Sequence, residues 1–187
     1  MIRFARRTIW TLCCLLLLVL SATAISADDD GKKHRYRERR RGDNHYGEKY
    51  LKPASNTIYT DQCGACHFAY QPGLLPSESW RRILGDSENH FGETLDLDAD
   101  AKEELNTYLT SNAANTSSSK LSQKIMRCLE GQTPLRITDI PYIRKEHHEI
   151  GQSVVNRPSV GSLSNCIACH SSADRGIYDD DRVSIPE

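Results

Sequence analysis

The sequence predicts a small, mainly α-helical protein with two lobes. Three observations predict this class. Segments with the apolar spacing and capping residues of helices recur along the chain, whereas runs with the alternation of a β-strand are few. The pentapeptide CGACH at 63–67 returns as CIACH at 166–170. The stretch between the two copies is long enough for each copy to centre a lobe of its own, at 51–118 and 119–187.

The first 27 residues are predicted to be a signal peptide and not part of the fold. Three arginines precede an apolar stretch at 9–20, and small-residue cleavage signals end at Ala24 and at Ala27. An uncleaved membrane anchor is the alternative, but the apolar stretch is shorter than the roughly 20 residues that span a bilayer. We therefore expect the protein to be exported, with cleavage after Ala24 or Ala27.

A basic tail at 28–50 is expected to follow the signal peptide. Its segment KKHRYRERRR (32–41) has seven Lys and Arg residues and one glutamate, a composition that cannot bury a core and predicts disorder. The tail is either a solubilising leader or an electrostatic contact for an acidic partner or an anionic lipid surface. The whole chain has a formal charge of −1, so no overall basic excess indicates a nucleic-acid partner.

Three helices are predicted in the first half of the globular part. A short helix at 56–64 leads into the first pentapeptide. Ser77 is expected to cap a helix that continues through Leu84, and Asp98 a longer helix that ends near Ala113.

Two further helices are predicted in the second half. The first covers 120–130, where Met126 and Cys128 are expected to be ordinary core residues. Cys128 has a second interpretation, a free thiol able to pair with another chain. Pro141 is suited to a first helical residue and Gly151 to a stop, which together predict a helix between them.

The repeated CxxCH pentapeptide is the motif that attaches c-type haem. Each cysteine sulfur adds to one vinyl group of the haem, and the adjacent histidine then binds the iron. The motif assigns Cys63, Cys66 and His67 to haem 1, and Cys166, Cys169 and His170 to haem 2.

Paired cysteines can also hold a zinc ion, form a thiol redox centre or close disulfides. Two CxxC pairs that share a structural zinc are typically about 15–20 residues apart, whereas 99 residues separate Cys66 from Cys166. A thiol redox centre needs a βαβ scaffold, for which the sequence gives no signal. Two CxxC disulfides would leave the adjacent histidines unexplained. Two covalently bound haems c are the prediction that accounts for both cysteines and histidines.

The second axial ligand of each iron is predicted to be a histidine. Met126 is the only methionine left after cleavage, which excludes methionine at both haems. The globular part offers His90, His147 and His148 as spare histidines. Proximity in sequence pairs His90 with haem 1 and His147 with haem 2, while a crossed pairing and the use of His148 stay open.

Two six-coordinate irons favour electron transfer over catalysis, since neither has an open position for a substrate. We therefore expect no enzyme activity and no catalytic residue. The alternative is a dihaem enzyme or ligand-binding protein with one open iron, similar to a peroxidase.

The assembled motifs resemble the dihaem cytochrome c family of purple phototrophic and other Gram-negative bacteria. The resembling stretches are CGACHFAYQPGLLP (63–76), HFGE (90–93), YLTSNAA (108–114), GQTPLRIT (131–138), PYIRKEHHEI (141–150) and NCIACHSSADRGIY (165–178). The resemblance implies a periplasmic, mostly helical electron carrier with two bis-histidine haems, and it places a ligand on His147. It also implies redox partners, namely a small oxygen-binding c-type cytochrome and a membrane cytochrome b. We expect a monomer.

Overall fold

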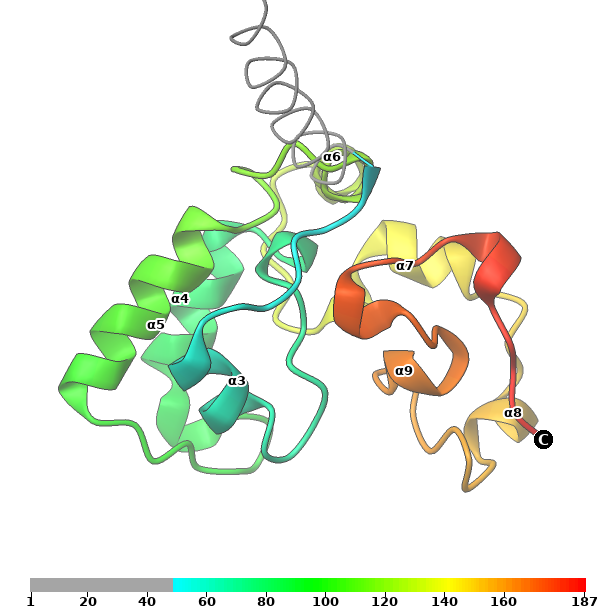
Figure 1. The fold of residues 1–187 in the computed structure, drawn as a ribbon, viewed down its shortest axis with the longest axis horizontal. Helices are drawn as coiled ribbons and strands as arrows, with labels where there is room; N and C mark the ends of the chain where they lie inside the picture. Colours follow the sequence, from blue (N-terminus) through cyan, green and yellow to red (C-terminus); the bar gives the residue numbers. More distant parts are fainter. Residues whose placement is uncertain (1–48) are drawn as a thin grey trace, which may run out of the picture. The chain divides into compact units, whose positions relative to one another are not determined.

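The computed structural model describes residues 49–187, so the predicted signal peptide and nearly all of the basic tail lie outside the described residues. All described residues belong to one compact unit. It is built from helices and loops, with two isolated β-bridges and no strand in the described part (Figure 1). The predicted mainly α-helical class is confirmed. In this part of the chain, none of the helices has the length and apolarity needed to cross a bilayer.

The first half holds α3 (Thr57–Cys63), α4 (Ser77–Gly85) and α5 (Ala99–Ser111), as predicted. Helices α4 and α5 lie side by side, and α3 packs against α5 (Figure 1). The Asn56 side chain accepts a hydrogen bond from Tyr59 N and starts α3, while Asp98 accepts one from Ala101 N and starts α5. Local capping thus explains where these two helices begin.

The predicted capping role of Ser77 is wrong. Pro76 precedes α4 as its cap residue, and Ser77 is the first residue inside the helix. The Ser77 backbone N–H and hydroxyl both donate to the side-chain oxygen of Asn115, at 2.8 and 2.9 Å. The free backbone N–H at the start of α4 therefore finds its hydrogen-bond acceptor far away in the sequence, which no local pattern could indicate.

The second half begins with α6 (Lys120–Leu129), whose N-terminus is capped by Ser119. Ser122 is buried on α6, and its hydroxyl donates to the carbonyl of Gly73 at 2.7 Å. This bond ties α6 to the 3₁₀-helix η1 (Pro72–Leu74) in the first half.

The expectation that Cys128 is a buried core residue is wrong, because its side chain is exposed. The inner face of α6 is formed by Ser122, Ile125 and Leu129, which are spaced at three and four residues. Cys128 lies beside this stripe and not on it. Met126, in contrast, packs partly buried against the main core, as expected of an ordinary core residue.

The helix that starts at Pro141 is shorter than predicted. Helix α7 (Pro141–Glu146) ends before His147, whose Nδ1 lies 2.8 Å from the carbonyl oxygen of Ile143. The imidazole thus pairs with a carbonyl at the helix end, and the chain leaves the helix five residues before Gly151. Short helices follow at α8 (Gln152–Val155) and α9 (Cys166–Cys169). The other 3₁₀-helices are η2 (Ser87–Asn89), η3 (Ile137–Asp139), η4 (Ala173–Arg175) and η5 (Asp180–Arg182).

The main buried cluster draws its fully buried members from residues 51–140. Beyond residue 140, burial of large side chains is confined to Val160 and Ile177 among the described residues. The start of the described chain contacts the segment after the second CxxCH motif, because the backbone N–H of Leu51 donates to the carbonyl of Gly176 at 3.1 Å. The division into lobes at residue 118 stays a prediction.

Candidate functional site

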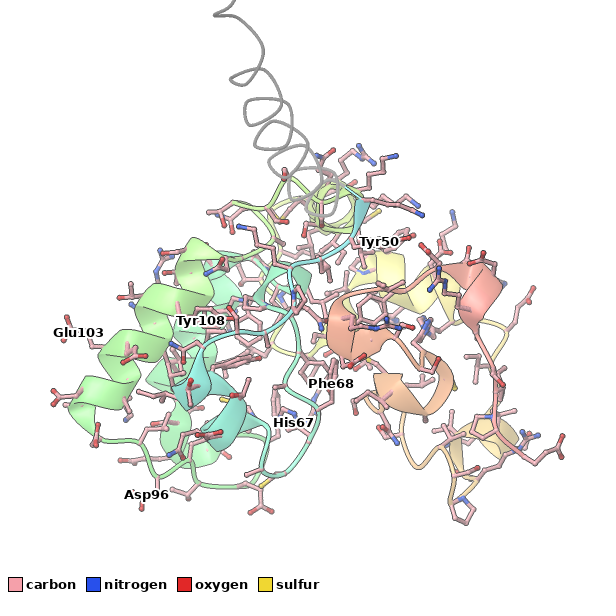
Figure 2. All side chains as sticks on the ribbon, in the orientation of Figure 1. Tyr50, His67, Phe68, Asp96, Glu103 and Tyr108 are labelled. Atoms are coloured by element: carbon pink, nitrogen blue, oxygen red, sulfur yellow. The ribbon has the colours of Figure 1, made fainter. Side chains whose placement is uncertain are left out.

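The first candidate site, called site 1 below, consists of Cys63, Cys66, His67 and His90. The imidazole rings of His67 and His90 face each other, with centroids 6.2 Å apart and planes inclined by 24°. Cys63 is the last residue of α3, and His67 follows on the segment that leaves this helix (Figure 2). The structure therefore brings together two histidines that are distant in sequence, next to the first cysteine pair.

His90 is held at the start of a tight turn. Its N–H donates to the carbonyl of Glu93 at 2.7 Å, and Glu93 N–H donates back at 3.2 Å. The two residues inside this turn, Phe91 and Gly92, have positive φ angles of 57° and 101°. This conformation is typical of two-residue turns and is unusual for phenylalanine. The Arg136 guanidinium lies over the Phe91 ring, 3.9 Å from its centroid, and packs on the turn.

His67 is oriented by its own neighbour. Its Nδ1 lies 2.8 Å from the carbonyl oxygen of Phe68, so this nitrogen carries the proton and donates it. Nε2 is then the nitrogen with a free lone pair. A backbone acceptor on one nitrogen is the arrangement that fixes the tautomer and orientation of metal-binding histidines.

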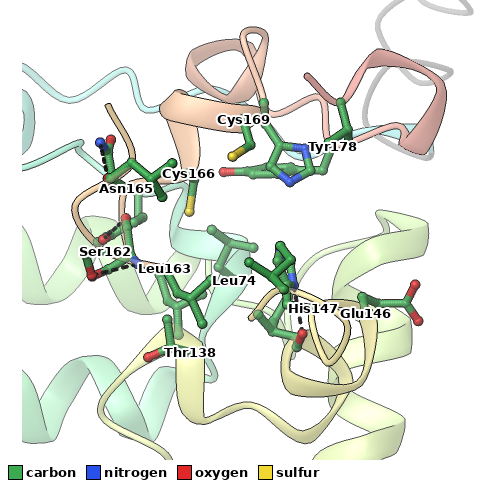
Figure 3. A pocket seen from close by; sticks show the side chains of 18 of the residues that line it. Leu74, Thr138, Glu146, His147, Ser162, Leu163, Asn165, Cys166, Cys169 and Tyr178 are labelled. Carbon is green, nitrogen blue, oxygen red and sulfur yellow. Dashed lines mark hydrogen bonds between the residues drawn. The ribbon is translucent and has the colours of Figure 1, made fainter. Parts of the chain in front are cut away.

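The second candidate site, called site 2 below, consists of Cys166, Cys169, His170 and His147. Helix α9 places Cys166 and Cys169 one turn apart, on one side of a pocket, with His147 on the other side (Figure 3). The rings of His147 and His170 have centroids 6.0 Å apart and planes inclined by 62°. Site 2 thus repeats the pairing of site 1 with a larger angle between the imidazoles.

His147 and its neighbour His148 differ in their surroundings. His147 lines the site 2 pocket, and its Nδ1 is paired with the Ile143 carbonyl, which leaves Nε2 for another partner. The side chain of His148 is 70% exposed, and its Nε2 lies 3.8 Å from the carboxylate of Glu149. Of the two histidines, only His147 is brought to His170.

The wall of the site 2 pocket is mostly apolar. Side chains from both halves of the chain contribute to it, which gives the pocket the character of a site for a large hydrophobic group. Its apolar lining residues are Leu74, Leu121, Ile137, Ile143, Ile150, Val154, Val160, Leu163 and Val183.

The two histidine pairs fit a metal held between them. Two imidazoles that bind opposite sides of one ion through bonds of about 2 Å have their ring centroids about 6 Å apart. The observed separations of 6.2 and 6.0 Å match this value. The residues present therefore fit a planar macrocycle with a central metal at each site, placed next to two cysteines that can hold it covalently.

Burial sets the protonation of these groups. It lowers the pKa of His90 and of His170, and the facing histidine lowers each pKa further, which favours the neutral imidazole that binds metals. Burial also raises the pKa of Cys63 and of Cys166 to about 11. A thiol redox centre requires a thiolate with a lowered pKa, so these raised values argue against such a centre at either cysteine pair.

Neither disulfides within the CxxC segments nor a zinc ion shared between them gains support from the described residues. None of the five cysteines in residues 49–187 forms a disulfide. The same part of the chain contains no group of three or more His, Cys, Asp or Glu side chains arranged to hold a metal ion.

Some residues near the two sites could not be recognised from the sequence. Tyr178 lies with its ring 5.4 Å from that of His170, and its hydroxyl donates to the side chain of Gln71 at 2.6 Å. Gln71 is completely buried and also donates to the carbonyl of Ala173. These contacts join segments about a hundred residues apart, and the only local signal was that Gln71 is a polar residue beside a turn-rich loop.

A helical chain with two CxxCH segments, each opposite a further histidine, defines the class of c-type cytochromes with two haems. The chain belongs to the dihaem cytochrome c family, whose model matches residues 59–178. The resemblance inferred from the sequence motifs is confirmed. No curated protein matches the chain.

Solved structures agree with the family assignment. A dihaem cytochrome c from Rhodobacter sphaeroides is 33% identical, with a TM-score of 0.60, and the match covers 69% of this chain and 99% of that one. A dihaem cytochrome c from Shewanella baltica OS155 is 36% identical, with a TM-score of 0.58, over 70% of this chain and 93% of that one. A further structure of the Rhodobacter sphaeroides protein is 33% identical, with a TM-score of 0.56, over 67% and 99% of the two chains.

The predicted cofactors follow from this membership: the protein carries two covalently bound c-type haems. Its role is electron transfer by haem c.

Proposed function

We propose that this protein is a periplasmic carrier that passes single electrons between other redox proteins through two bis-histidine haems. The observation that carries the proposal is the spacing of the two histidine pairs, 6.2 Å at site 1 and 6.0 Å at site 2. Each bound haem supplies an iron that exchanges one electron between its ferrous and ferric states.

The chain contributes attachment, ligation and burial. Cys63 and Cys66 would form the thioethers at site 1, and Cys166 and Cys169 those at site 2. The axial ligands would be His67 and His90 at site 1, and His170 and His147 at site 2. With an imidazole on both faces, neither iron would have an open position, and an electron could be exchanged without a change of ligand.

The test removes one distal ligand. A His90→Ala protein should lose the low-spin signal of one haem and gain a high-spin one, because the iron at site 1 would lack its second imidazole. Electron paramagnetic resonance of the oxidised protein measures this change. A His90→Ala protein that keeps two fully low-spin haems contradicts the ligand assignment.

The alternative function is a peroxidase-like enzyme or a gas-binding protein with one open iron. Carbon monoxide binding to the reduced parent protein distinguishes the two functions. A carrier with two closed irons should not bind carbon monoxide at neutral pH, whereas an open iron should bind it.

The proposed location and partners rest on the N-terminal sequence and the family. Export is tested by fractionation and by the mass of the mature protein, which should begin at Ile25 or Asp28 and include two haems. The proposed partners are other redox proteins, a small oxygen-binding c-type cytochrome and a membrane cytochrome b, and the proposed state is a monomer.

A further inference from the structure

Tyr70 contacts both candidate sites. Its ring centroid lies 5.1 Å from that of His67 in site 1, with the planes inclined by 31°. Its hydroxyl donates to the carbonyl of Ser164 at 2.7 Å. Ser164 stands two residues before Cys166, and both Tyr70 and Ser164 line the pocket of site 2. One side chain thus reaches from His67 of site 1 to the segment that carries Cys166 of site 2.

The surroundings of Tyr70 hold it in this position. Its carbonyl accepts a hydrogen bond from the hydroxyl of Tyr59 at 2.7 Å, and the Phe68 ring packs edge-on against its ring at 5.3 Å. The next residue, Gln71, is completely buried and accepts a hydrogen bond from the hydroxyl of Tyr178, which packs on His170. The backbone at 70–71 is therefore fixed on the sides of both sites, and Tyr70 has little freedom to reorient.

We infer that Tyr70 is a positioning residue that couples the two haem sites. Its ring packs against the His67 imidazole, which the Phe68 carbonyl also holds, and its hydroxyl holds the segment that carries Cys166. The reduction potential of a haem depends on the orientation and hydrogen bonding of its ligands and on its burial, so both potentials depend on this one side chain. The inference rests on the proposed ligation of the two sites.

A second tyrosine provides a matched control. Tyr142 also lines the pocket of site 2, and its hydroxyl accepts a hydrogen bond from Lys124 at 3.3 Å. No described ring contact joins Tyr142 to the histidines of site 1. Its substitution tests the effect of losing a tyrosine hydroxyl near site 2 alone.

The experiment compares Tyr70→Phe, Tyr70→Leu and Tyr142→Phe with the parent, each as the full chain carrying both haems. Spectroelectrochemical titration gives the two reduction potentials, and electron paramagnetic resonance gives the spectrum of each iron. The signal lost in a His90→Ala protein identifies the iron of site 1, so each shift can be assigned to one site.

Tyr70→Phe keeps the ring against His67 but loses the bond to Ser164. It should shift the potential of site 2 and leave the spectrum of site 1 unchanged. Tyr70→Leu loses both contacts and should shift both reduction potentials. Site 1 should therefore keep its parent potential in Tyr70→Phe but not in Tyr70→Leu. Tyr142→Phe should leave site 1 at the parent potential.

Two results would overturn the inference. One is a Tyr70→Leu protein in which either site keeps the parent potential, and the other is a Tyr142→Phe protein in which both sites shift. If Tyr70→Leu does not accumulate as a folded protein, Tyr70→Phe decides: a parent-like site 2 overturns the coupling, and a shifted site 2 supports it. If electron paramagnetic resonance of the parent protein does not show two low-spin signals, the proposed ligation is wrong. The inference, which rests on that ligation, is then overturned as well.

Discussion

His147 and His148 are adjacent in sequence, but only the first faces His170. His147→Ala should therefore open the iron of site 2 to carbon monoxide, because the distal imidazole is removed. His148→Ala should leave both irons closed, since its side chain is largely exposed. The carbon monoxide difference spectrum of each reduced variant measures this. Binding in His148→Ala and not in His147→Ala would reverse the assignment.

Gly176 makes one of the contacts that join the start of the described chain to its C-terminal segment. Its φ is 72°, and its carbonyl accepts the hydrogen bond from the Leu51 N–H. A Cβ built on Gly176 would collide with the carbonyl of Leu51. Gly176→Ala should lower the free energy of unfolding by about 2 kcal/mol or more, from backbone strain plus the collision. Guanidinium unfolding of the holoprotein measures this loss.

Gly161 is the matched control for this substitution. Its φ is 71°, but a Cβ there would meet no atom within 4 Å. Gly161→Ala should therefore cost only the strain of the left-handed conformation, about 1 kcal/mol. Equal losses for the two variants would mean that the contact with Leu51 contributes nothing.

At the scale of elements, the segment from Tyr70 through η1 joins the two halves of the unit. Gln71 bonds to Ala173 and Tyr178, and Gly73 in η1 accepts from Ser122 of α6. Gln71→Leu should lower the free energy of unfolding by about 2 kcal/mol, because the Tyr178 hydroxyl loses its acceptor and the Ala173 carbonyl keeps only the bond from the Gly176 N–H.

Gln123→Leu on α6 is the comparison for this variant. Its amide donates to the carbonyl of Ser118 in an exposed bond, so its loss should change the free energy of unfolding by no more than about 0.5 kcal/mol. If Gln71→Leu is as stable as Gln123→Leu, the buried network does not hold the halves together.

Helices with local signals were predicted well from the sequence. Asp98 before α5 and the loop before α6 mark their starts within a residue. The end of α7 was misplaced because Gly151 was taken as its stop, whereas the helix ends before His147, whose imidazole contacts the Ile143 carbonyl. The start of α4 was misread because the partner of the Ser77 N–H is Asn115, which lies in the loop after α5.

The two CxxCH motifs were readable because their chemistry is contained in five consecutive residues. The contacts of Tyr70 with Ser164 and of Gln71 with Tyr178 were not, because they depend on how segments about a hundred residues apart pack. The pairing of His90 with His67 was inferred from proximity in sequence, and the structure places the two rings together. Their ligation of iron stays a prediction.

At the scale of the whole molecule, protein burial is uneven. The main cluster draws its fully buried residues from 51–140, whereas the chain beyond α7 consists of short helices around the apolar pocket of site 2. We expect haem 2 to supply much of the core there, in the way that a structural metal stabilises a small domain.

Removing the attachment of haem 2 should therefore loosen one region only. In a Cys166→Ala/Cys169→Ala protein, amides at 166–177 should exchange hydrogen about tenfold or more faster than in the parent, while those of α5 keep their protection. Hydrogen exchange followed by mass spectrometry measures both regions. Cys128→Ala, which removes an exposed thiol, should leave both unchanged. Equal loss of protection in α5 and in 166–177 would contradict a local role for haem 2.

The bond between Leu51 and Gly176 has a consequence for how the molecule is made. Leu51 is completely buried, yet its backbone partner Gly176 lies far later in the sequence. The chain is delivered N-terminus first, so the Leu51 N–H has no backbone partner until the segment with Gly176 has emerged. Completion of the core is thereby delayed to the same stage at which the second CxxCH segment becomes available for haem attachment.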